Sequence, residues 1–98
     1  MWARISTYEG APEAIDPSTA YVRESILPKV RGIPGYRGIY AVADRTSGRT
    51  MSITLWDSEE ALRASEADAD RLRNESTEQA DGSVVSVERF EVTLSELV

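Results

Sequence analysis

The alternation of strand-like and helix-like segments is the feature that most constrains the fold of this chain. Four segments are rich in β-branched and aromatic residues and alternate as half-buried strands do. They span residues 2–8, 36–44, 51–56 and 83–92. A turn with Gly48 near its end joins the second and third segments, which predicts a β-hairpin. Residues 93–98 also alternate and could add one more strand.

Two further segments are typical of helices. Asp16 and Pro17 mark a helix start, because a capping side chain precedes a proline at the first helical position. Apolar residues then recur at helical spacing up to Val30. Pro28 lies inside this pattern, so we expect a kink or a break near Ile26.

The second helical segment begins in the acidic sequence of residues 57–60, where Asp57 or Ser58 can cap, and continues to about Asn74. The full order is therefore β-α-β-β-α-β. This order predicts a ferredoxin-like α+β fold, an antiparallel sheet with both helices on one face. The 98 residues correspond to one domain, residues 1–98, whose small core would gain from burial against a partner chain.

Composition excludes several kinds of chemistry. The chain has no Cys, which excludes disulfides, thiolate catalysis and Cys-ligated metals. It has no His, so the usual general base and the common haem and zinc ligands are missing, and we expect neither a metal nor a cofactor. A net charge of −6 disfavours nucleic acid as a partner. No apolar run approaches the roughly 20 residues of a membrane span, and residues 1–5 do not resemble a signal peptide. We therefore expect a cytoplasmic protein without a membrane partner.

Strand alternation divides the strand residues between two faces of the sheet. We expect the more apolar sets to pack under the helices, namely Ala3, Ile5, Thr7, Ile39, Ala41, Met51, Ile53, Leu55, Val85 and Val87. A bulge near Val84 and Val85 could shift the last two. The helix-free face would then carry Trp2, Arg4, Ser6, Tyr8, Tyr40, Val42, Ser52, Thr54, Trp56, Ser86, Glu88 and Phe90.

Aromatic residues on the helix-free face predict a partner. Trp2, Tyr40, Trp56 and Phe90 would together present roughly 600–1,000 Å², at about 150–250 Å² each. This exceeds the roughly 300–600 Å² of the largest apolar patch on a typical monomer. We therefore expect a homodimer through this open sheet face, related by a two-fold axis. The enclosed space, lined by aromatic and hydroxyl groups, suits a small aromatic ligand.

Two segments resemble a known family. Residues 27–38, LPKVRGIPGYRG, are similar to the helix-to-strand passage of the antibiotic biosynthesis monooxygenase-like family. Residues 52–62, SITLWDSEEAL, are similar to the strand-Trp-helix junction of that family. The family belongs to the dimeric α+β barrel superfamily, and the resemblance covers about residues 1–92 in element order.

The resemblance implies a homodimer with a sheet-lined pocket in each subunit. Some relatives are cofactor-independent oxygenases of phenolic polyketides or quinol-like substrates, others degrade haem, and many have no assigned activity. Trp56 matches a Trp that lines the pocket in catalytic relatives. The haem-degrading branch also uses a His on the second helix and an Asn in the first strand. This chain has no His and has Ser6 and Thr7 at the latter place, which disfavours haem degradation.

The candidate catalytic residues are Glu88, Arg4 and Tyr40. In this hypothesis Glu88 takes a phenolic proton, Arg4 holds the phenolate, and Tyr40 donates a hydrogen bond to a substrate oxygen. The electron-rich anion then reacts with O₂ without a metal or flavin. The same three residues could instead form an ion pair and an amphipathic contact at a dimer interface. The candidate substrate-binding residues are Trp56, Ser6, Thr54, Phe90 and Trp2.

Two functions from different classes remain open. The first is a cofactor-free monooxygenase that oxidises a phenolic or polycyclic substrate. The second is a non-catalytic dimeric module with a ligand-binding or regulatory role, since a fold does not determine a function. Pocket geometry discriminates them. A cluster of Arg4, Glu88 and Tyr40 at an open cavity favours chemistry, and a lumen filled by aromatic side chains favours a structural dimer.

Overall fold

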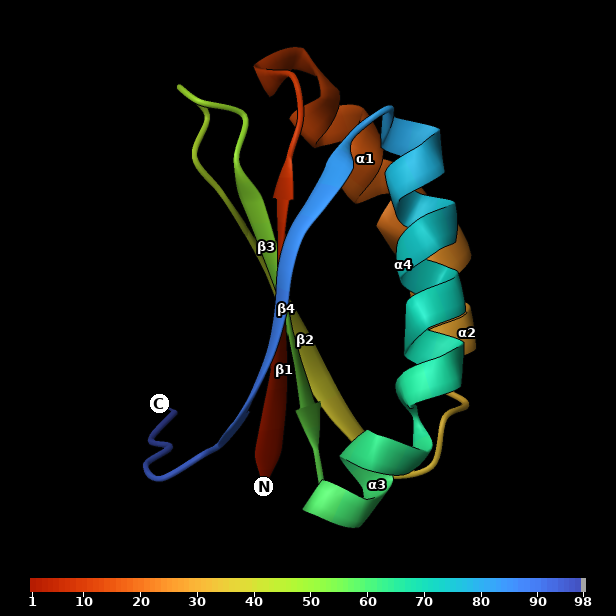
Figure 1. Cartoon of the computed structure of the whole chain (residues 1–98), viewed down its shortest axis with the longest axis vertical. Helices are drawn as coiled ribbons and strands as arrows, with labels where there is room; N and C mark the ends of the chain where they lie inside the picture. Colours follow the sequence, from red (N-terminus) through yellow and green to blue (C-terminus); the bar gives the residue numbers. More distant parts are fainter. Residues whose placement is uncertain (98) are drawn as a thin grey trace.

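The computed structural model describes residues 1–97, in which four strands form one antiparallel sheet. The strands are β1 (Trp2–Glu9), β2 (Tyr36–Ala43), β3 (Thr50–Trp56) and β4 (Ser83–Glu91), and their order in the sheet is β2-β3-β1-β4. The helices lie on one side of the sheet and leave its other face uncovered (Figure 1). The predicted ferredoxin-like α+β fold is confirmed.

The first helical region is longer and less regular than predicted. A 3₁₀ turn (Pro12–Ala14) leads into α1 (Ile15–Tyr21), followed by a π-helical segment (Val22–Ile26) and α2 (Leu27–Val30). The helix begins before Asp16, which does not cap it, because this carboxylate binds Arg45 instead. Pro28 does not break the helix. Its missing N–H and its ring are accommodated by the wider π-helical turn that precedes it.

The second helical region consists of α3 (Glu59–Ala64) and α4 (Glu66–Ala80). Ser58 caps α3, its hydroxyl accepting a hydrogen bond of 3.1 Å from the backbone N–H of Ala61. The helix α4 extends past the predicted end at Asn74 and stops at Asp81, which adopts a left-handed conformation. Both helical regions pack on the same side of the sheet (Figure 1).

The predicted faces of β1 and β3 are wrong. Arg4 and Ser6 bond to groups on α3 and α4, so they face the helices, and their register partners Thr54 and Ser52 face the helices too. The apolar sets lie on the helix-free face: Ala3, Ile5, Thr7, Met51, Ile53 and Leu55. Alternation identifies which residues share a face, but which face the helices cover depends on long-range packing.

The predicted faces of β2 and of most of β4 are correct. Ile39 pairs with Thr54 and faces the helices, while Glu88 pairs with Ile5 on the helix-free face. The register of β4 against β1 shifts between Thr7 and Tyr8, leaving Val85 as an extra residue. The bulge expected near this position is therefore confirmed.

The core lies between the helices and one end of the sheet. Ile26, Val30 and Leu72 form its centre, and Trp56 and Leu62 are fully buried. Residues 92–97 form neither helix nor strand and project from the sheet, so the strand expected at 93–98 is not formed as far as Leu97, and Val98 lies outside the described residues. Among residues 1–97, no helix combines the length and apolar character needed to cross a bilayer.

Candidate functional site

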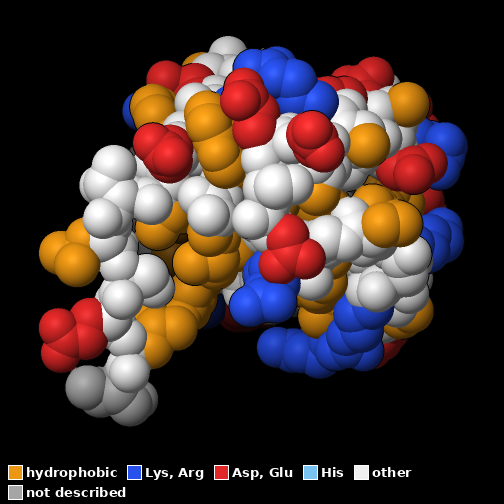
Figure 2. Space-filling model, turned by 90° about the horizontal axis from the view of Figure 1, so that it is seen from below, with side chains coloured by type: hydrophobic (Ala, Val, Ile, Leu, Met, Phe, Trp, Pro, Cys, Tyr) orange, Lys and Arg blue, Asp and Glu red, His pale blue; other side chains and the backbone are white. Residues whose placement is uncertain are grey.

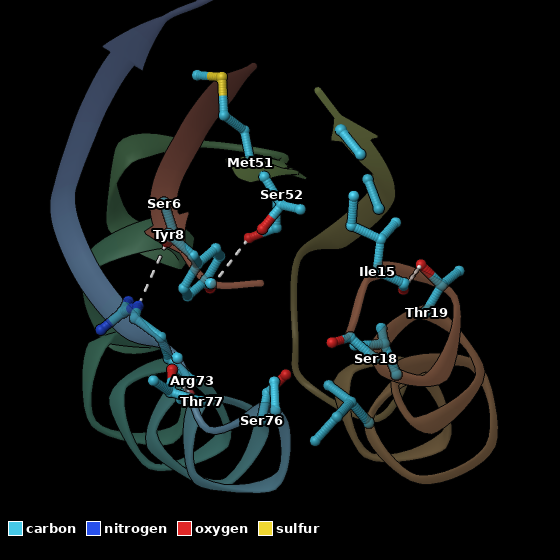
Figure 3. Close-up of a pocket in the computed structure, with 18 of the residues that line it drawn as sticks. Ser6, Tyr8, Ile15, Ser18, Thr19, Met51, Ser52, Arg73, Ser76 and Thr77 are labelled. Atoms are coloured by element: carbon cyan, nitrogen blue, oxygen red, sulfur yellow. Dashed lines mark hydrogen bonds between the residues drawn. The ribbon is translucent and has the colours of Figure 1, made fainter. Parts of the chain in front are cut away.

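A cavity of about 630 Å³ lies between the sheet and the helices. This volume is within the roughly 300–1,000 Å³ range of small-molecule sites. Figure 3 shows Ser18 of α1 and Ser76 of α4 directed toward the interior, opposite Tyr8 and Ser52 of the sheet. The cavity is therefore bounded by both helical regions and by the helix-facing side of the sheet.

The lining combines apolar and hydroxyl side chains. The apolar part includes Ile15, Val22, Ile26, Val30, Ile33, Ile39, Met51, Trp56 and Leu72. The hydroxyl groups come from Ser6, Tyr8, Ser18, Thr19, Thr50, Ser52, Thr54, Ser76, Thr77 and Ser83. Within the described part of the chain, the carboxylates that line it are those of Glu9 and Asp16, and no three acidic side chains form a group that could hold a metal ion.

Arg4 is the buried charge of the cavity. Its residue is 2% exposed, and its Nη2 donates to the carbonyl of Leu62 at 2.8 Å, to Ser65 Oγ at 2.9 Å and to Glu66 Oε1 at 2.9 Å. Its Nε is buried as well and, within residues 1–97, has no hydrogen-bond partner. Such an unpaired buried donor costs stability unless a ligand or water satisfies it.

Glu66 compensates Arg4 only in part, because it also binds Arg89. Its Oε2 accepts from Arg89 Nη2 at 2.7 Å. The hydrogen bond from Arg89 and then that from Arg4 lower the pKa of Glu66 to about 2, against the opposing effect of partial burial. Burial lowers the pKa of Arg4, and repulsion from Arg73 and Arg89 acts in the same direction, although Glu66 opposes both. The cluster therefore contains more positive than negative charge.

Arg73 of α4 is a second buried cation beside Arg4. Its Nε donates to Ser6 Oγ at 3.3 Å, and its Nη1 binds Asp70 at 2.9 Å. The Asp70 side chain is 67% exposed, so water screens its charge strongly. Asp70 therefore compensates the charge of Arg73 only weakly, and the positive potential of Arg73 extends to the sheet side, next to Ser6.

Trp56 forms one end of the cavity wall and is held from three sides. Its Nε1 donates to Thr54 Oγ1 at 3.0 Å, and its ring meets Tyr36 edge to face at 5.9 Å between centroids. The Arg4 guanidinium lies 5.4 Å from the Trp56 ring centroid, which is a cation–π distance. The indole and the guanidinium therefore fix each other in position.

Comparison with known proteins identifies the fold. No family model matches the sequence. The chain is 32% identical over 92 residues to the uncharacterized protein Rv2557 of Mycobacterium tuberculosis, a match that covers 94% of this chain and 41% of that protein. The chain thus spans about two fifths of the length of the curated relatives that it matches.

Solved structures match almost the whole chain. A monooxygenase from the gene ActVA-Orf6 of Streptomyces coelicolor, in complex with nanaomycin D, has a TM-score of 0.77 at 14% identity, covering 99% of this chain and 91% of its own. A candidate antibiotic biosynthesis monooxygenase from Deinococcus radiodurans has a TM-score of 0.72 at 13% identity, covering 100% and 98%. SnoaB, a cofactor-independent oxygenase from Streptomyces nogalater, has a TM-score of 0.66 at 14% identity, covering 96% and 94%. This chain has the antibiotic biosynthesis monooxygenase-like fold.

Within this monooxygenase-like fold, four of the predicted site residues meet at the cavity and four do not. Arg4, Ser6, Thr54 and Trp56 line it together. The other four lie elsewhere: Glu88, Tyr40 and Phe90 on the exposed helix-free face, and Trp2, half-buried on the Arg4 face, outside the cavity lining.

The predicted cluster of Arg4, Glu88 and Tyr40 is therefore not formed. Arg4 pairs with Arg89 across the sheet, whereas Glu88 pairs with Ile5 and points to the opposite face. The carboxylate that binds Arg4 is Glu66. The cavity lies inside one subunit, between sheet and helices. The space predicted between two sheets involves a second copy and stays a prediction.

Arg73 and Ser76 of α4 are site residues that the sequence analysis missed. Leu62, Ser65, Ala69, Leu72 and Ser76 recur at intervals of three or four residues, and this helical spacing could have placed Ser76 on the cavity side of the second helical region. Arg73 directly follows Leu72 in this pattern, which was the signal available for it.

Proposed function

We propose that this chain binds a small phenolic or polycyclic ligand in the cavity and oxidises it with O₂ without a cofactor. The observation that carries the proposal is Arg4, which lines the cavity beside Trp56 and whose buried Nε has no hydrogen-bond partner within residues 1–97. The fold shared with a cofactor-independent oxygenase supports the proposal. The mixed apolar and hydroxyl lining suits a flat ring system that carries oxygen substituents.

The site favours stabilisation of an anion over proton transfer to a strong base. Glu66, the carboxylate next to Arg4, has a pKa of about 2 and is therefore a poor proton acceptor at neutral pH. A cation beside a bound phenol lowers the pKa of that phenol, because it stabilises the phenolate. In the proposed reaction Arg4 holds the phenolate, and water carries the proton away.

The electrons for the proposed reaction come from the substrate. A phenol with a free ring position and O₂ give a quinone and water. One oxygen atom forms the new C=O at the ring carbon, and the phenolic C–O becomes the second C=O. The other oxygen atom leaves as water with the two hydrogens that the substrate loses. The four electrons that reduce O₂ are thus supplied by the ring and need no outside donor.

The test is oxygen uptake with 1-naphthol, in which the position para to the hydroxyl is free. We expect uptake above the rate without protein, with one atom of ¹⁸O₂ in the quinone. Arg4→Gln is expected to slow it by about a hundredfold, the usual effect of removing an oxyanion donor. Arg71→Gln, on the exposed side of α4, serves as the matched control and is expected to keep the rate. No uptake with 1-naphthol or larger polycyclic phenols would contradict the oxygenase proposal.

A non-catalytic ligand-binding or regulatory module is the second candidate. The observation that favours it is the lack, among the described residues around Arg4, of a carboxylate with a normal pKa that could serve as a base. In this case the phenols bind to the cavity, as measured by quenching of tryptophan fluorescence, but consume no oxygen. The same samples therefore distinguish the two candidates.

The proposed function includes a homodimer through the helix-free face of the sheet. This face carries Tyr40, Val42 and Phe90 with 46–51% of their surface exposed, alongside Ile53 and Leu55. Figure 2 shows hydrophobic side chains on the side of the molecule from which the C-terminal residues project. A second copy covering this face would remove these apolar surfaces from water, which is favourable at about 25 cal/mol per Å².

A further inference from the structure

We infer that the sheet wall of the cavity is an anion subsite, formed by Arg4, Ser6 and Thr54, which takes an ionised oxygen of the ligand. The inference deepens the proposed function and depends on its first part, that the cavity binds a small aromatic ligand. It names the class of that ligand: an aromatic acid or a phenol that binds as its anion. A neutral ring system of the same shape would bind more weakly.

The three residues share one patch of the sheet. Arg4 and Thr54 are register partners on β1 and β3, so their Cβ atoms lie about 4.5–5.5 Å apart. Ser6 lies two residues further along β1 on the same face, about 6.6 Å away at the usual rise per residue. All three line the cavity. The distances are those over which neighbouring groups can converge on one ligand substituent.

Each of the three groups has a proton to donate. Ser6 Oγ accepts from Arg73 Nε at 3.3 Å, and Thr54 Oγ1 accepts from Trp56 Nε1 at 3.0 Å. A hydroxyl that accepts such a bond keeps its own proton for another partner. Arg4 adds its buried Nε–H, which has no partner within residues 1–97. The patch thus presents donors, and a ligand there has to supply the acceptors.

The charge around the patch also favours an anion. Arg4 and Arg89 share the partly buried carboxylate of Glu66, and Arg73 pairs with the strongly exposed Asp70, so three guanidinium groups have two carboxylate partners. Burial lowers the pKa of Arg4, and repulsion from Arg73 and Arg89 acts in the same direction, as expected where cations are in excess.

The carboxylates in the cavity lining lie at a different end of the cavity. Glu9 follows Arg4 by five residues in β1, about 16 Å away along the strand. Asp16 is paired with Arg45 in an exposed ion pair. Neither carboxylate therefore neutralises the patch. An anion bound there interacts with the positive charge of the arginines without competition from Glu9 or Asp16.

The test compares 2-naphthoate with 2-naphthamide, which has the same shape without the charge. Binding is measured by titration calorimetry and by quenching of tryptophan fluorescence, since Trp56 adjoins the patch. We expect naphthoate to bind at least about tenfold more tightly, the factor that one hydrogen bond to a charged group supplies. Arg4→Gln should reduce this preference to near unity.

Ser6→Ala removes one donor and leaves the Arg4–Glu66 ion pair in place, so it tests the inference if Arg4→Gln does not fold. It should lower naphthoate affinity several-fold and leave naphthamide affinity nearly unchanged. Arg71→Gln removes an exposed arginine of α4 and should keep the full preference. Equal affinity of the wild-type protein for the two probes would overturn the anion subsite and the role of Arg4 in holding a phenolate, but it would leave ligand binding by the cavity standing. Failure of both probes to bind would overturn both.

Discussion

Glu66 links the buried Arg4 to the surface, and its replacement tests the electrostatics of the site. In the Glu66→Gln variant Arg4 keeps its bonds to Leu62 and Ser65 but loses its carboxylate partner. The pKa of Glu66 is about 2 in the folded protein against 4.5 ordinarily. At about 1.36 kcal/mol per unit of pKa, this difference of 2.5 corresponds to an upper bound of roughly 3.4 kcal/mol. The side chain is 33% exposed, so solvent screening reduces the expected effect to about 1–2 kcal/mol.

The sign of the pH dependence follows from the lowered pKa. A carboxylate whose pKa is depressed by folding stabilises the native state above the unfolded pKa, and this contribution is lost as pH falls toward the folded pKa. Urea unfolding of the wild-type protein should therefore show a loss of stability from Glu66 as pH falls from about 5 to about 2. The Glu66→Gln variant should be less stable at pH 7 and should lack this part of the pH dependence.

The control for this prediction is Glu59→Gln, which removes an exposed ion pair with Arg63 within α3. Exposed pairs of this kind contribute about 0.3–0.5 kcal/mol, so the control should unfold almost as the wild-type protein does. If Glu66→Gln and wild type lose stability in parallel between pH 5 and pH 2, the ion-pair reasoning is refuted. Equal stability of the two proteins at pH 7 would refute it as well.

Three further changes test the fold, the assembly and the origin of the ion-pair effect. Gly35→Ala should lower the free energy of unfolding in urea by about 1–3 kcal/mol, because Gly35 has a φ of 84° and an added methyl would overlap α3. The control Gly32→Ala should lower it by less than about 1 kcal/mol. Ile53→Lys should halve the mass measured by light scattering at micromolar concentration while circular dichroism stays native; a wild-type monomer would contradict the dimer. The double variant Arg4→Met, Glu66→Gln should be more stable than Glu66→Gln alone, because it contains no buried Arg4 cation without a carboxylate partner. A double variant less stable than Glu66→Gln would argue against the unpaired cation as the cause of the lost stability.

Local signals in the sequence were sufficient for the order of elements. The hairpin around Gly48 was predicted, Ser58 was one of two candidate caps, and a bulge near Val84 and Val85 was considered; each depends on neighbouring residues. The start of α1 was displaced because Asp16 binds Arg45, a residue that is 29 positions away in the chain. Local capping preference could not indicate this competing partner.

The site required contacts between residues far apart in the sequence. Arg4 was predicted as a catalytic candidate on the helix-free face, whereas it lies under the helices, and its partner Glu66 is 62 positions away in the chain. Glu88 was chosen instead because alternation placed both residues on one face. Alternation shows which residues of one strand share a face. It does not show which residue of the neighbouring strand lies opposite them, and the register places Glu88 opposite Ile5.

The polarity of the two sheet faces bears on the function itself. A face that only had to pack under helices would be most stable with apolar residues, because replacing a buried ion pair by well-packed apolar side chains is often neutral or stabilising. In β1 and β3 the distribution is the reverse: Ala3, Ile5, Ile53 and Leu55 lie on the uncovered face. Arg4, Ser6 and Thr54 lie under the helices. The arrangement places a guanidinium in the cavity lining and leaves its buried Nε without a partner within residues 1–97, at a cost in stability. In the proposed function, an anion bound beside Arg4 would offset this cost, and a second copy covering the apolar face would add stability.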